Sequence, residues 1–600
     1  MNYIKTLPEI YSDALAHGPN RKLYNHKVGD EWKSHTYQEV YDMLPDLGFG
    51  LQSLGVKEQD KVGILSENRP EWCFFDWTCS HFNFVSVPVY QTSIPKQIEY
   101  IVNHAECKVV VVSNEEQLKK LIPLKSKIKS LKYAILLEKV EHNEDWVISI
   151  EDLIKAGKET RKASEVSMED ISAKVKPDDL WSIIYTSGTS GDPKGVLLTQ
   201  FNIAANVQQT QEHEKFKSNK RWLSFLPLSH TFERCTSLFS FWIGAEIYFA
   251  ESIAKVPDNL KEVKPHFMTT VPRLLEKIYS TVIEQVLAGP KAKQEIFNWA
   301  QHIGHKTAVK YLKDNKTPLG PLGFKYSLAK KLVFSKIAAV FGGEFSRCVS
   351  GGAPLAPEVG EFFLMSGIRV LEGYGLTEMS PITHANVNEH LVFGTVGRAV
   401  PDVQTTIAPD GEILVKGPNM MRGYYKSPVE TAEAIDKDGW FHTGDIGFID
   451  EDGNLKITDR KKNLIVTSGG KNIAPAGVER ELCSSKFIEQ AVVVGDRRKF
   501  LVAILVPSLE IIIKWGKKQS PPLEFSNYED VATSKDVDKL IKDELAASQG
   551  DLARYEQIKY FFIAPQPFTI ETGELTASMK IKRNEIINKY DLEIEELYNN

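Results

Sequence analysis

The sequence predicts an α/β protein. We expect a large N-terminal domain of layered, mostly parallel sheets and helices, plus a small α+β C-terminal domain. Strand-like apolar runs alternate with helical patterns through the first 400 residues, and near Arg460 the composition changes to a compact basic and glycine-rich stretch. The 600 residues are also too many for one hydrophobic core. We therefore place the domains at residues 1–459 and 460–600.

Composition excludes several classes of protein. The chain is 42% hydrophobic and 25% charged, as ordinary globular proteins are, and its net charge of −6 gives no sign of nucleic-acid binding. The six cysteines form no C-x-x-C pair, which argues against a zinc site or a disulfide framework and suits a reducing cytosol. No signal-like N-terminus and no long apolar run is found. We expect a cytoplasmic protein without a transmembrane helix.

The N-terminal domain begins its alternation early. Residues 61–65 and 85–89 are predicted strands, and the aromatic-rich segment between them, residues 70–84, is a predicted helix. Residues 107–112 and 133–137 are further apolar runs that indicate buried strands. Strands separated by helices favour parallel sheets.

A glycine-rich loop follows the predicted strand at residues 180–185. Glycines let the backbone approach a ligand, and successive N–H groups in such a turn form an anion-binding concavity. The composition therefore suits a polyphosphate, although a flexible surface loop is the other interpretation. The pattern is not a Walker A loop, because Lys194 is followed by Gly195. The residues that would contact phosphate are Thr186, Ser187, Gly188, Thr189, Ser190, Gly191 and Lys194.

The segment from Arg221 to His230 is predicted to start as a strand and to end in a turn, and Phe232 follows it. A histidine in this place is often structural. The apolar segment at residues 238–244 is either plain core or one wall of an apolar ligand pocket.

Residues 291–336 are unusually basic. They contain ten lysines and only two acids, Glu295 and Asp314, with aromatic residues interleaved. Two interpretations remain open. The segment is a solvated helical face, or it is a surface that makes peripheral contact with an anionic membrane.

Two glycine-rich turns each follow a short apolar run, and we expect them to form walls of one site at the carboxyl ends of the strands. The first turn contains Gly351, Gly352 and Ala353. In the second turn, Tyr374 and Gly375 precede Thr377 and Glu378. Tyr374 offers a ring to a base, Thr377 a hydroxyl to a phosphate, and Glu378 a hard oxygen to Mg²⁺.

Further candidates lie toward the C-terminus. Asp445 follows a turn, where a carboxylate either binds ribose hydroxyls or bonds its own backbone. Arg460 lies at the predicted domain boundary, and Lys580 precedes a terminal helix. Spacing alone assigns no role to Lys580.

In this order the motifs resemble the AMP-forming adenylating enzymes, which include acyl-CoA synthetases, firefly luciferase and peptide-synthetase adenylation domains. The resemblance covers about residues 10–590, and L-P-L-S-H-T-F-E-R around His230 looks like the long-chain fatty acyl branch. It implies an acyl pocket at His230, Phe232, Gly351 and Tyr374.

The resemblance also implies roles for the remaining residues. The phosphate loop, the two glycine turns, Asp445 and Arg460 would bind ATP, and Glu378 would hold Mg²⁺. Lys194, Thr377 and Lys580 would be catalytic, with Lys580 the adenylation lysine. Here Met579 replaces the glycine that many relatives have before this lysine, and Lys582 is the weaker claimant. The small domain would be mobile about a hinge. The hinge and the coenzyme A contacts would involve Lys462, Gly469 and Gly470.

The implied activity is that of a long-chain fatty acid–CoA ligase. Its substrates would be a fatty acid, ATP and coenzyme A, and a homodimer is compatible with the family. Three alternatives remain: a fatty acyl-AMP ligase that loads a carrier protein, a luciferase-like oxygenase, and a non-catalytic nucleotide-binding regulator. Fatty acyl-AMP ligases have an insertion near the domain boundary, and residues 444–471 of this chain show none. Chain length and saturation of the acid stay open.

Overall fold

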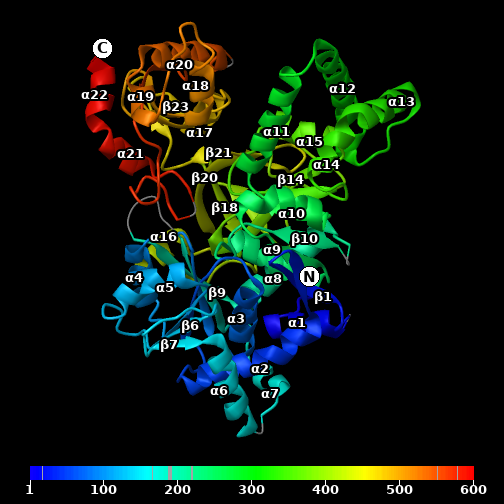
Figure 1. Ribbon diagram of the computed structural model, residues 1–600, viewed down its shortest axis with the longest axis vertical. Helices are drawn as coiled ribbons and strands as arrows, with labels where there is room; N and C mark the ends of the chain where they lie inside the picture. The colour runs from blue at the N-terminus through cyan, green and yellow to red at the C-terminus, as the bar shows by residue number, and fades with distance from the viewer. Residues whose placement is uncertain are drawn as a thin grey trace.

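The computed structural model describes residues 1–16, 18–164, 166–186, 192–217, 220–550, 552–577 and 579–599. Layers of sheet and helix form a large N-terminal body, and a small C-terminal domain lies over one end of it (Figure 1). This arrangement confirms the predicted fold class. The boundary between residues 459 and 460 stays a prediction.

The first sheet has the strand order β19-β9-β8-β4-β3-β5-β6-β7. Its pairs from β4 through β7, and the β4–β8 pair, are parallel, whereas β8–β9 and β9–β19 are antiparallel. The glycine-rich loop therefore joins two antiparallel strands. The strands are β3 (Lys61–Leu65), β4 (Val85–Val89), β5 (Val109–Val112), β6 (Tyr133–Leu136), β7 (Val147–Ser149), β8 (Leu180–Thr186), β9 (Lys194–Thr199) and β19 (Gly423–Tyr424).

The second sheet has the order β16-β15-β14-β13-β12-β10-β11-β1-β2 and is parallel from β14 through β1. Antiparallel strands close it at both edges. The strands are β1 (Lys22–Val28), β2 (Glu31–Thr36), β10 (Arg221–Ser224), β11 (Glu246–Phe249), β12 (Phe267–Thr270), β13 (Arg347–Ser350), β14 (Arg369–Gly375), β15 (Ile382–Ala385) and β16 (Arg398–Ala399).

One apolar core joins these two sheets through α3 (Pro70–His81), α8 (Gln200–Glu214) and α9 (Thr231–Trp242). All three helices are buried along most of their length, as helices between two layers must be. Buried Arg234 on α9 crosses this layer. Its guanidinium donates to Asp76 on α3 and to Ser182 on β8, and it lies 3.7 Å from the ring centre of Trp181.

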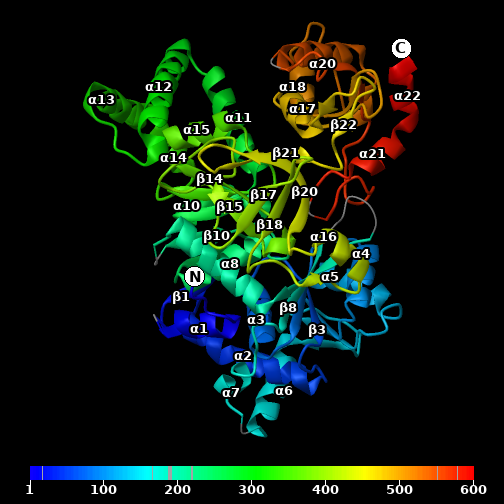
Figure 2. The same ribbon diagram turned by 180° about the vertical axis from the view of Figure 1, so that it is seen from behind.

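A third sheet and the C-terminal domain complete the chain (Figure 2). The third sheet has the order β17-β18-β20-β21, and the C-terminal domain contains the sheet β24-β25-β26 and the hairpin β22-β23. The strands are β17 (Gln404–Ile407), β18 (Glu412–Lys416), β20 (Phe441–Ile449), β21 (Leu455–Arg460), β22 (Ile465–Val466), β23 (Asn472–Ile473), β24 (Ile488–Val494), β25 (Leu501–Pro507) and β26 (Ile558–Ile563).

Helices cover the sheets and the C-terminal domain. Those in the N-terminal body are α1 (Leu7–Ala16), α2 (Tyr37–Ser53), α4 (Pro95–His104), α5 (Glu115–Leu121), α6 (Ile150–Lys162), α7 (Met168–Ser172), α10 (Val256–Val263), α11 (Pro272–Leu287), α15 (Pro357–Met365) and α16 (Pro428–Ala434). Those in the C-terminal domain are α17 (Pro475–Leu482), α18 (Leu509–Gly516), α19 (Tyr528–Ala532), α20 (Lys535–Ser548), α21 (Arg583–Lys589) and α22 (Asp591–Asn599).

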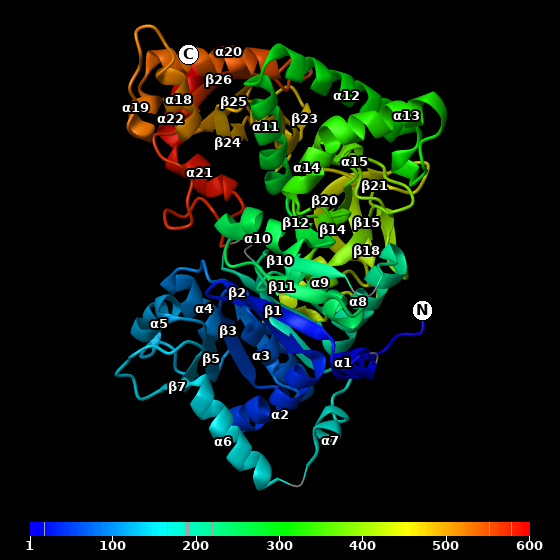
Figure 3. The ribbon, with the colours of Figure 1, turned by 45° about the vertical axis from the view of Figure 1, so that its right-hand side comes forward.

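The basic segment folds into an arm at the edge of the molecule (Figure 3). It consists of α12 (Lys291–Lys310), α13 (Gly320–Ala329), a π-turn (Lys330–Phe334) and α14 (Ser335–Val340). Among the residues described, every helix is too short or too polar to span a bilayer.

Candidate active site

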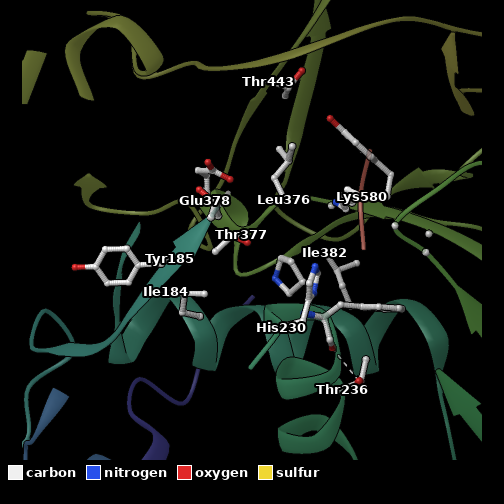
Figure 4. A pocket seen from close by; sticks show the side chains of 18 of the residues that line it. Ile184, Tyr185, His230, Thr236, Leu376, Thr377, Glu378, Ile382, Thr443 and Lys580 are labelled. Atoms are coloured by element: carbon white, nitrogen blue, oxygen red, sulfur yellow. Dashed lines mark hydrogen bonds between the residues drawn. The ribbon is translucent and has the colours of Figure 1, made fainter. Parts of the chain in front are cut away.

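A cavity of about 490 Å³ lies where the second and third sheets meet the C-terminal domain. Residues from both domains line it, and Figure 4 shows Thr377, Glu378, His230 and Lys580 around the same space. The sequence predicted these four residues for one site, although they come from three separate parts of the chain.

Two glycines allow the close packing of the cavity walls. A Cβ on Gly375 would lie 2.1 Å from the carbonyl oxygen of Pro381, so only glycine fits at the end of β14. A Cβ on Gly351 would approach the ring of Phe232 to 3.3 Å. Gly352 has a φ of +84°, which other residues rarely adopt. These predicted wall residues therefore have a local structural reason to be glycine.

Asp445 is held between Tyr374 and Arg460. The Tyr374 hydroxyl donates to one carboxylate oxygen at 2.5 Å, and the Nε of Arg460 lies 3.2 Å from the other. The two charged residues are direct partners across β20 and β21. Burial raises the pKa of Asp445, while Arg460 and Tyr374 act in the opposite direction. A buried carboxylate fixed in this way can accept hydrogen bonds from a diol.

Glu378 is held by a residue that the sequence did not predict. The hydroxyl of Tyr424 on β19 donates to Glu378 at 2.9 Å, and the Nζ of Lys194 lies 5.1 Å from the centre of the same ring. Beside them, the hydroxyl of Thr231 donates to that of Thr377 at 3.2 Å. The start of β9 supplies the cation, and the short 3₁₀ turn after β14 (Thr377–Met379) supplies the hydroxyl and the carboxylate, with Tyr424 of β19 between them.

Lys580 reaches this wall from the C-terminal domain. Its side chain stays accessible to solvent through the cavity, but the surrounding protein and Arg460 lower its pKa, with Asp445 and Glu378 opposing them. The Thr92 hydroxyl, on the N-terminal body, donates at 2.8 Å to the carbonyl oxygen of Ala577. This bond fixes the Lys580 segment to the large domain.

His230 caps the N-terminus of α9. Its Nδ1 accepts a hydrogen bond from the N–H of Phe232, so the neutral ring carries its proton on Nε2. Burial, and to a smaller extent the charge of Lys580, lower the pKa of His230 to about 3. The ring therefore stays neutral at physiological pH and offers a donor, not a charge.

Beyond His230 the cavity continues as a channel whose wall contains the rings of one Trp and two Phe residues and four polar side chains. Glu214, at the end of α8, lies in its wall, and neither of its carboxylate oxygens has a hydrogen-bond partner among the described residues. Burial raises the pKa of Glu214 to about 8. The channel is lined by Thr210, His213, Glu214, Phe216, Trp222, Thr236 and Phe239.

The predicted site residues fall into three groups. Ser187, Gly188, Thr189, Ser190 and Gly191 lie outside the described residues. Ala353, Lys462, Gly469 and Gly470 are exposed. The others line the cavity or lie against it, and they are Thr186, Lys194, His230, Phe232, Gly351, Gly352, Tyr374, Gly375, Thr377, Glu378, Asp445, Arg460 and Lys580.

A magnesium ion fits this donor set in a limited sense. Within the described ranges, no group of three or more His, Cys, Asp or Glu side chains is arranged to hold a metal ion. One carboxylate, Glu378, and one hydroxyl, Thr377, face the cavity together. Mg²⁺ characteristically takes one or two carboxylates and fills its other positions with water and substrate phosphates.

Comparison with known proteins shows the family of the chain. Residues 12–425 match the model of the AMP-binding enzyme family, and residues 462–600 match that of the AMP-binding enzyme C-terminal domain. The chain is 34% identical over 590 residues to the long-chain-fatty-acid–CoA ligase FadD15 of Mycobacterium tuberculosis, covering 97% of this chain and 95% of that protein. It is 33% identical to long-chain-fatty-acid–CoA ligase 5 of Rattus norvegicus, covering 99% and 88%.

Solved structures show the same fold. The adenylation domain of a carboxylate reductase from Mycobacterium chelonae superposes with a TM-score of 0.77 at 22% identity, covering 99% of this chain and 91% of that one. A fatty acyl CoA synthetase of Mycobacterium tuberculosis gives a TM-score of 0.62 at 19% identity, covering 98% and 99%.

Proposed function

This chain belongs to the AMP-binding enzyme family of adenylate-forming, acyl-activating enzymes, and we propose that it joins a long-chain fatty acid to coenzyme A. The observation that carries the proposal is one cavity with two unlike ends. One end gathers Lys580, Glu378 and Tyr374, with Asp445 bonded to Tyr374, and the other, beside His230, is lined by the rings of Phe216, Trp222 and Phe239 among polar side chains. A nucleotide fits the first end and an aliphatic chain the second.

In the first half-reaction, an oxygen of the fatty acid carboxylate forms a bond to the α-phosphorus of ATP. The bond from that phosphorus to the bridging oxygen breaks, and pyrophosphate leaves. Two anions must meet, so the protein has to supply positive charge where negative charge develops. Lys194 and Lys580 do this, and Asp445 with Arg460 holds the ribose. Mg²⁺ bound with ATP would supply further positive charge, with Glu378 as its protein ligand.

α9 orients the carboxylate. The N-terminus of this helix, capped by His230, lies at the cavity, and the positive end of its dipole favours an anion there. Neutral His230 adds a donor from Nε2. These groups hold the acid without protonating it, which keeps the carboxylate nucleophilic.

In the second half-reaction, the thiol of coenzyme A gives up its proton to solvent and its sulfur attacks the acyl carbon of the adenylate. The bond from that carbon to the AMP oxygen breaks, and AMP leaves. Lys580 occupies the nucleotide end of the cavity in the arrangement described here. The C-terminal domain therefore has to rotate before the thiol enters, a hinge motion about the segment that follows Arg460. Lys462 and the exposed Gly469 and Gly470 lie in or just after that segment.

Acid-dependent exchange between ATP and pyrophosphate, measured without coenzyme A, tests the proposal. The acids are acetate, octanoate, palmitate, oleate and 4-coumarate. We expect exchange to be fastest with palmitate or oleate, because a longer aliphatic chain buries more apolar surface against Phe216, Trp222 and Phe239. Fastest exchange with acetate or 4-coumarate would contradict the substrate, and no exchange with any acid would contradict the activity.

A second assay separates the ligase from a fatty acyl-AMP ligase. With the best acid, addition of coenzyme A should yield acyl-CoA and AMP in equal amounts. Adenylation without any acyl-CoA would show that the acyl group goes to another acceptor, such as a carrier protein.

A further inference from the structure

The basic arm formed by residues 291–340 carries an apolar surface that no other part of the described chain covers. Four of its side chains, Leu319, Phe324, Leu328 and Leu332, are 69%, 76%, 42% and 41% exposed. Phe324, Leu328 and Leu332 are spaced four residues apart, so they share one side of the helical run of α13 and the π-turn. We call these four residues the outer stripe.

The arm is held firmly by its inner side. Gly304 of α12 packs so closely that a Cβ there would lie 2.5 Å from the Sδ of Met365 and 2.8 Å from the ring of Phe334. The hydroxyl of Tyr326 on α13 donates to the carbonyl oxygen of Met365 at 3.0 Å. The outer stripe is therefore presented on a fixed support, and its exposure does not come from an unanchored helix.

Lysines flank the outer stripe. Lys325 and Lys331 are exposed on either side of it, whereas the Nζ of Lys330 lies at the inner side of the arm, 3.8 Å from where a Cβ on Gly367 would be. In the part of the chain that the structure describes, Lys316 is the one lysine of this segment in an ion pair with a carboxylate. The segment has ten lysines against two acids, in a chain whose net charge is −6. The positive charge is thus concentrated on the arm and is not neutralised there.

We propose that the outer stripe and its lysines dock the protein on an anionic lipid surface. Apolar side chains flanked by lysines on a helix are the features of a helix that lies in a membrane interface, with the apolar side chains among the acyl chains and the ammonium groups at the lipid phosphates. A soluble protein partner would have to match both a strip of apolar side chains and a surplus of positive charge. The charge complementarity between these lysines and the phosphates of anionic lipids favours the membrane. The position of the arm, at the edge of the molecule, leaves the surface free to approach a plane (Figures 1 and 3).

Sedimentation of the full-length protein with vesicles tests the proposal. The vesicles contain either phosphatidylcholine alone or phosphatidylcholine with phosphatidylserine. We expect binding to the anionic vesicles that weakens as salt is added, and little binding to the neutral ones. Substitution of Lys325 and Lys331 by Gln should lower the partition coefficient on the order of 30-fold, because each lysine near an anionic surface contributes about 1 kcal/mol.

Matched controls separate the arm from total charge. Lys514 on α18 and Lys517 just after it are also exposed, and their substitution by Gln removes the same charge elsewhere. This control should bind anionic vesicles nearly as the parent protein does. For the apolar part, Phe324→Ser with Leu328→Ser should weaken binding more than tenfold. Ile253→Ser with Leu592→Ser, at side chains 72% and 78% exposed, should not.

Three results would overturn the proposal. The first is no binding of the parent protein to anionic vesicles at low salt. The second is an equal loss in the arm and control lysine variants, since total charge would then explain the binding. The third is a parent protein that forms a dimer and does not bind vesicles, when the double variant Phe324→Ser with Leu328→Ser is a monomer. A second copy of the chain would then cover the outer stripe. Thermal unfolding of each variant shows whether it is folded.

Discussion

Substitution of Lys580 by Ala should separate the two half-reactions. In the structure Lys580 lies in the cavity near Asp445 and Glu378, and the C-terminal domain delivers it there. Removing one preorganised charge that stabilises a transition state typically costs ~10²–10³ in rate, or roughly 2.7–4 kcal/mol. We expect ATP–pyrophosphate exchange to fall by this factor. Formation of acyl-CoA from supplied acyl-adenylate should change little, because Lys580 has left the cavity by then.

Lys582 provides a matched control. It lies two residues away and also lines the cavity, so Lys582→Ala removes a similar side chain from the same segment. It should leave both half-reactions near the rates of the parent protein. If Lys580→Ala slowed both half-reactions equally, or if Lys582→Ala matched its effect on exchange, the reasoning about Lys580 would be refuted.

The pH dependence gives a second check on the same residue. The pKa of Lys580 is lowered by the surrounding protein and then by Arg460. The charged form is the active one, so exchange should fall as the pH rises through this lowered pKa. The residual exchange of Lys580→Ala should not show this fall in rate at alkaline pH. If the rate fell in the same way in both proteins, another group would be responsible for it.

Other predictions follow from single contacts. Glu378→Ala should raise the Mg²⁺ concentration needed for half-maximal exchange, and an unchanged Mg²⁺ dependence would remove Glu378 from the metal site. Thr92→Val deletes the hydrogen bond to Ala577, worth about 0.5–1.5 kcal/mol, so exchange should fall roughly two- to tenfold while acyl-CoA formation from acyl-adenylate does not. Equal effects on exchange and on acyl-CoA formation would show that the bond does not stabilise the domain arrangement in which adenylation occurs. The pKa of Glu214 is raised from 4.5 to about 8, so the folded state binds the extra proton between these values and the parent protein loses stability as the pH rises through them. Glu214→Gln should therefore gain stability relative to the parent by up to about 1.4 kcal/mol for each pH unit in this window. Denaturant unfolding of both proteins at several pH values measures this. If the difference in unfolding free energy did not change with pH, Glu214 would be ionised in the fold.

The local elements of the fold were predictable because their residues allow few alternatives. The continuous apolar runs at residues 61–65 and 85–89 form strands with those bounds. The helix expected over residues 70–84 ends at His81, because Asn83 adopts a φ of +56° and turns the chain into β4. Asparagine tolerates a positive φ better than most residues, but an asparagine in the sequence does not by itself predict a positive φ.

The contacts that complete the site could not be predicted in the same way. Tyr424 is 46 residues from Glu378, and Thr92 is 485 residues from Ala577. Hydrogen bonds of this kind depend on how sheets and domains are placed, which local patterns do not encode. Glycines were predictable as a class, but the reason for Gly375 is the carbonyl oxygen of Pro381, and only the folded chain brings the two together.

The buried guanidinium of Arg234 has a consequence for how the substrate range of this enzyme can evolve. It lies one turn after His230 on α9 and ties that helix to Asp76 and Ser182. Any change that shifts α9 would leave a buried charge without its partner, so we expect replacements at the end of the cavity proposed to bind the carboxylate to be poorly tolerated. α8, which carries Glu214 at the channel, is not attached to this cluster by any of these bonds. New acid specificities should therefore arise through replacements on α8, while the residues around His230 drift far more slowly.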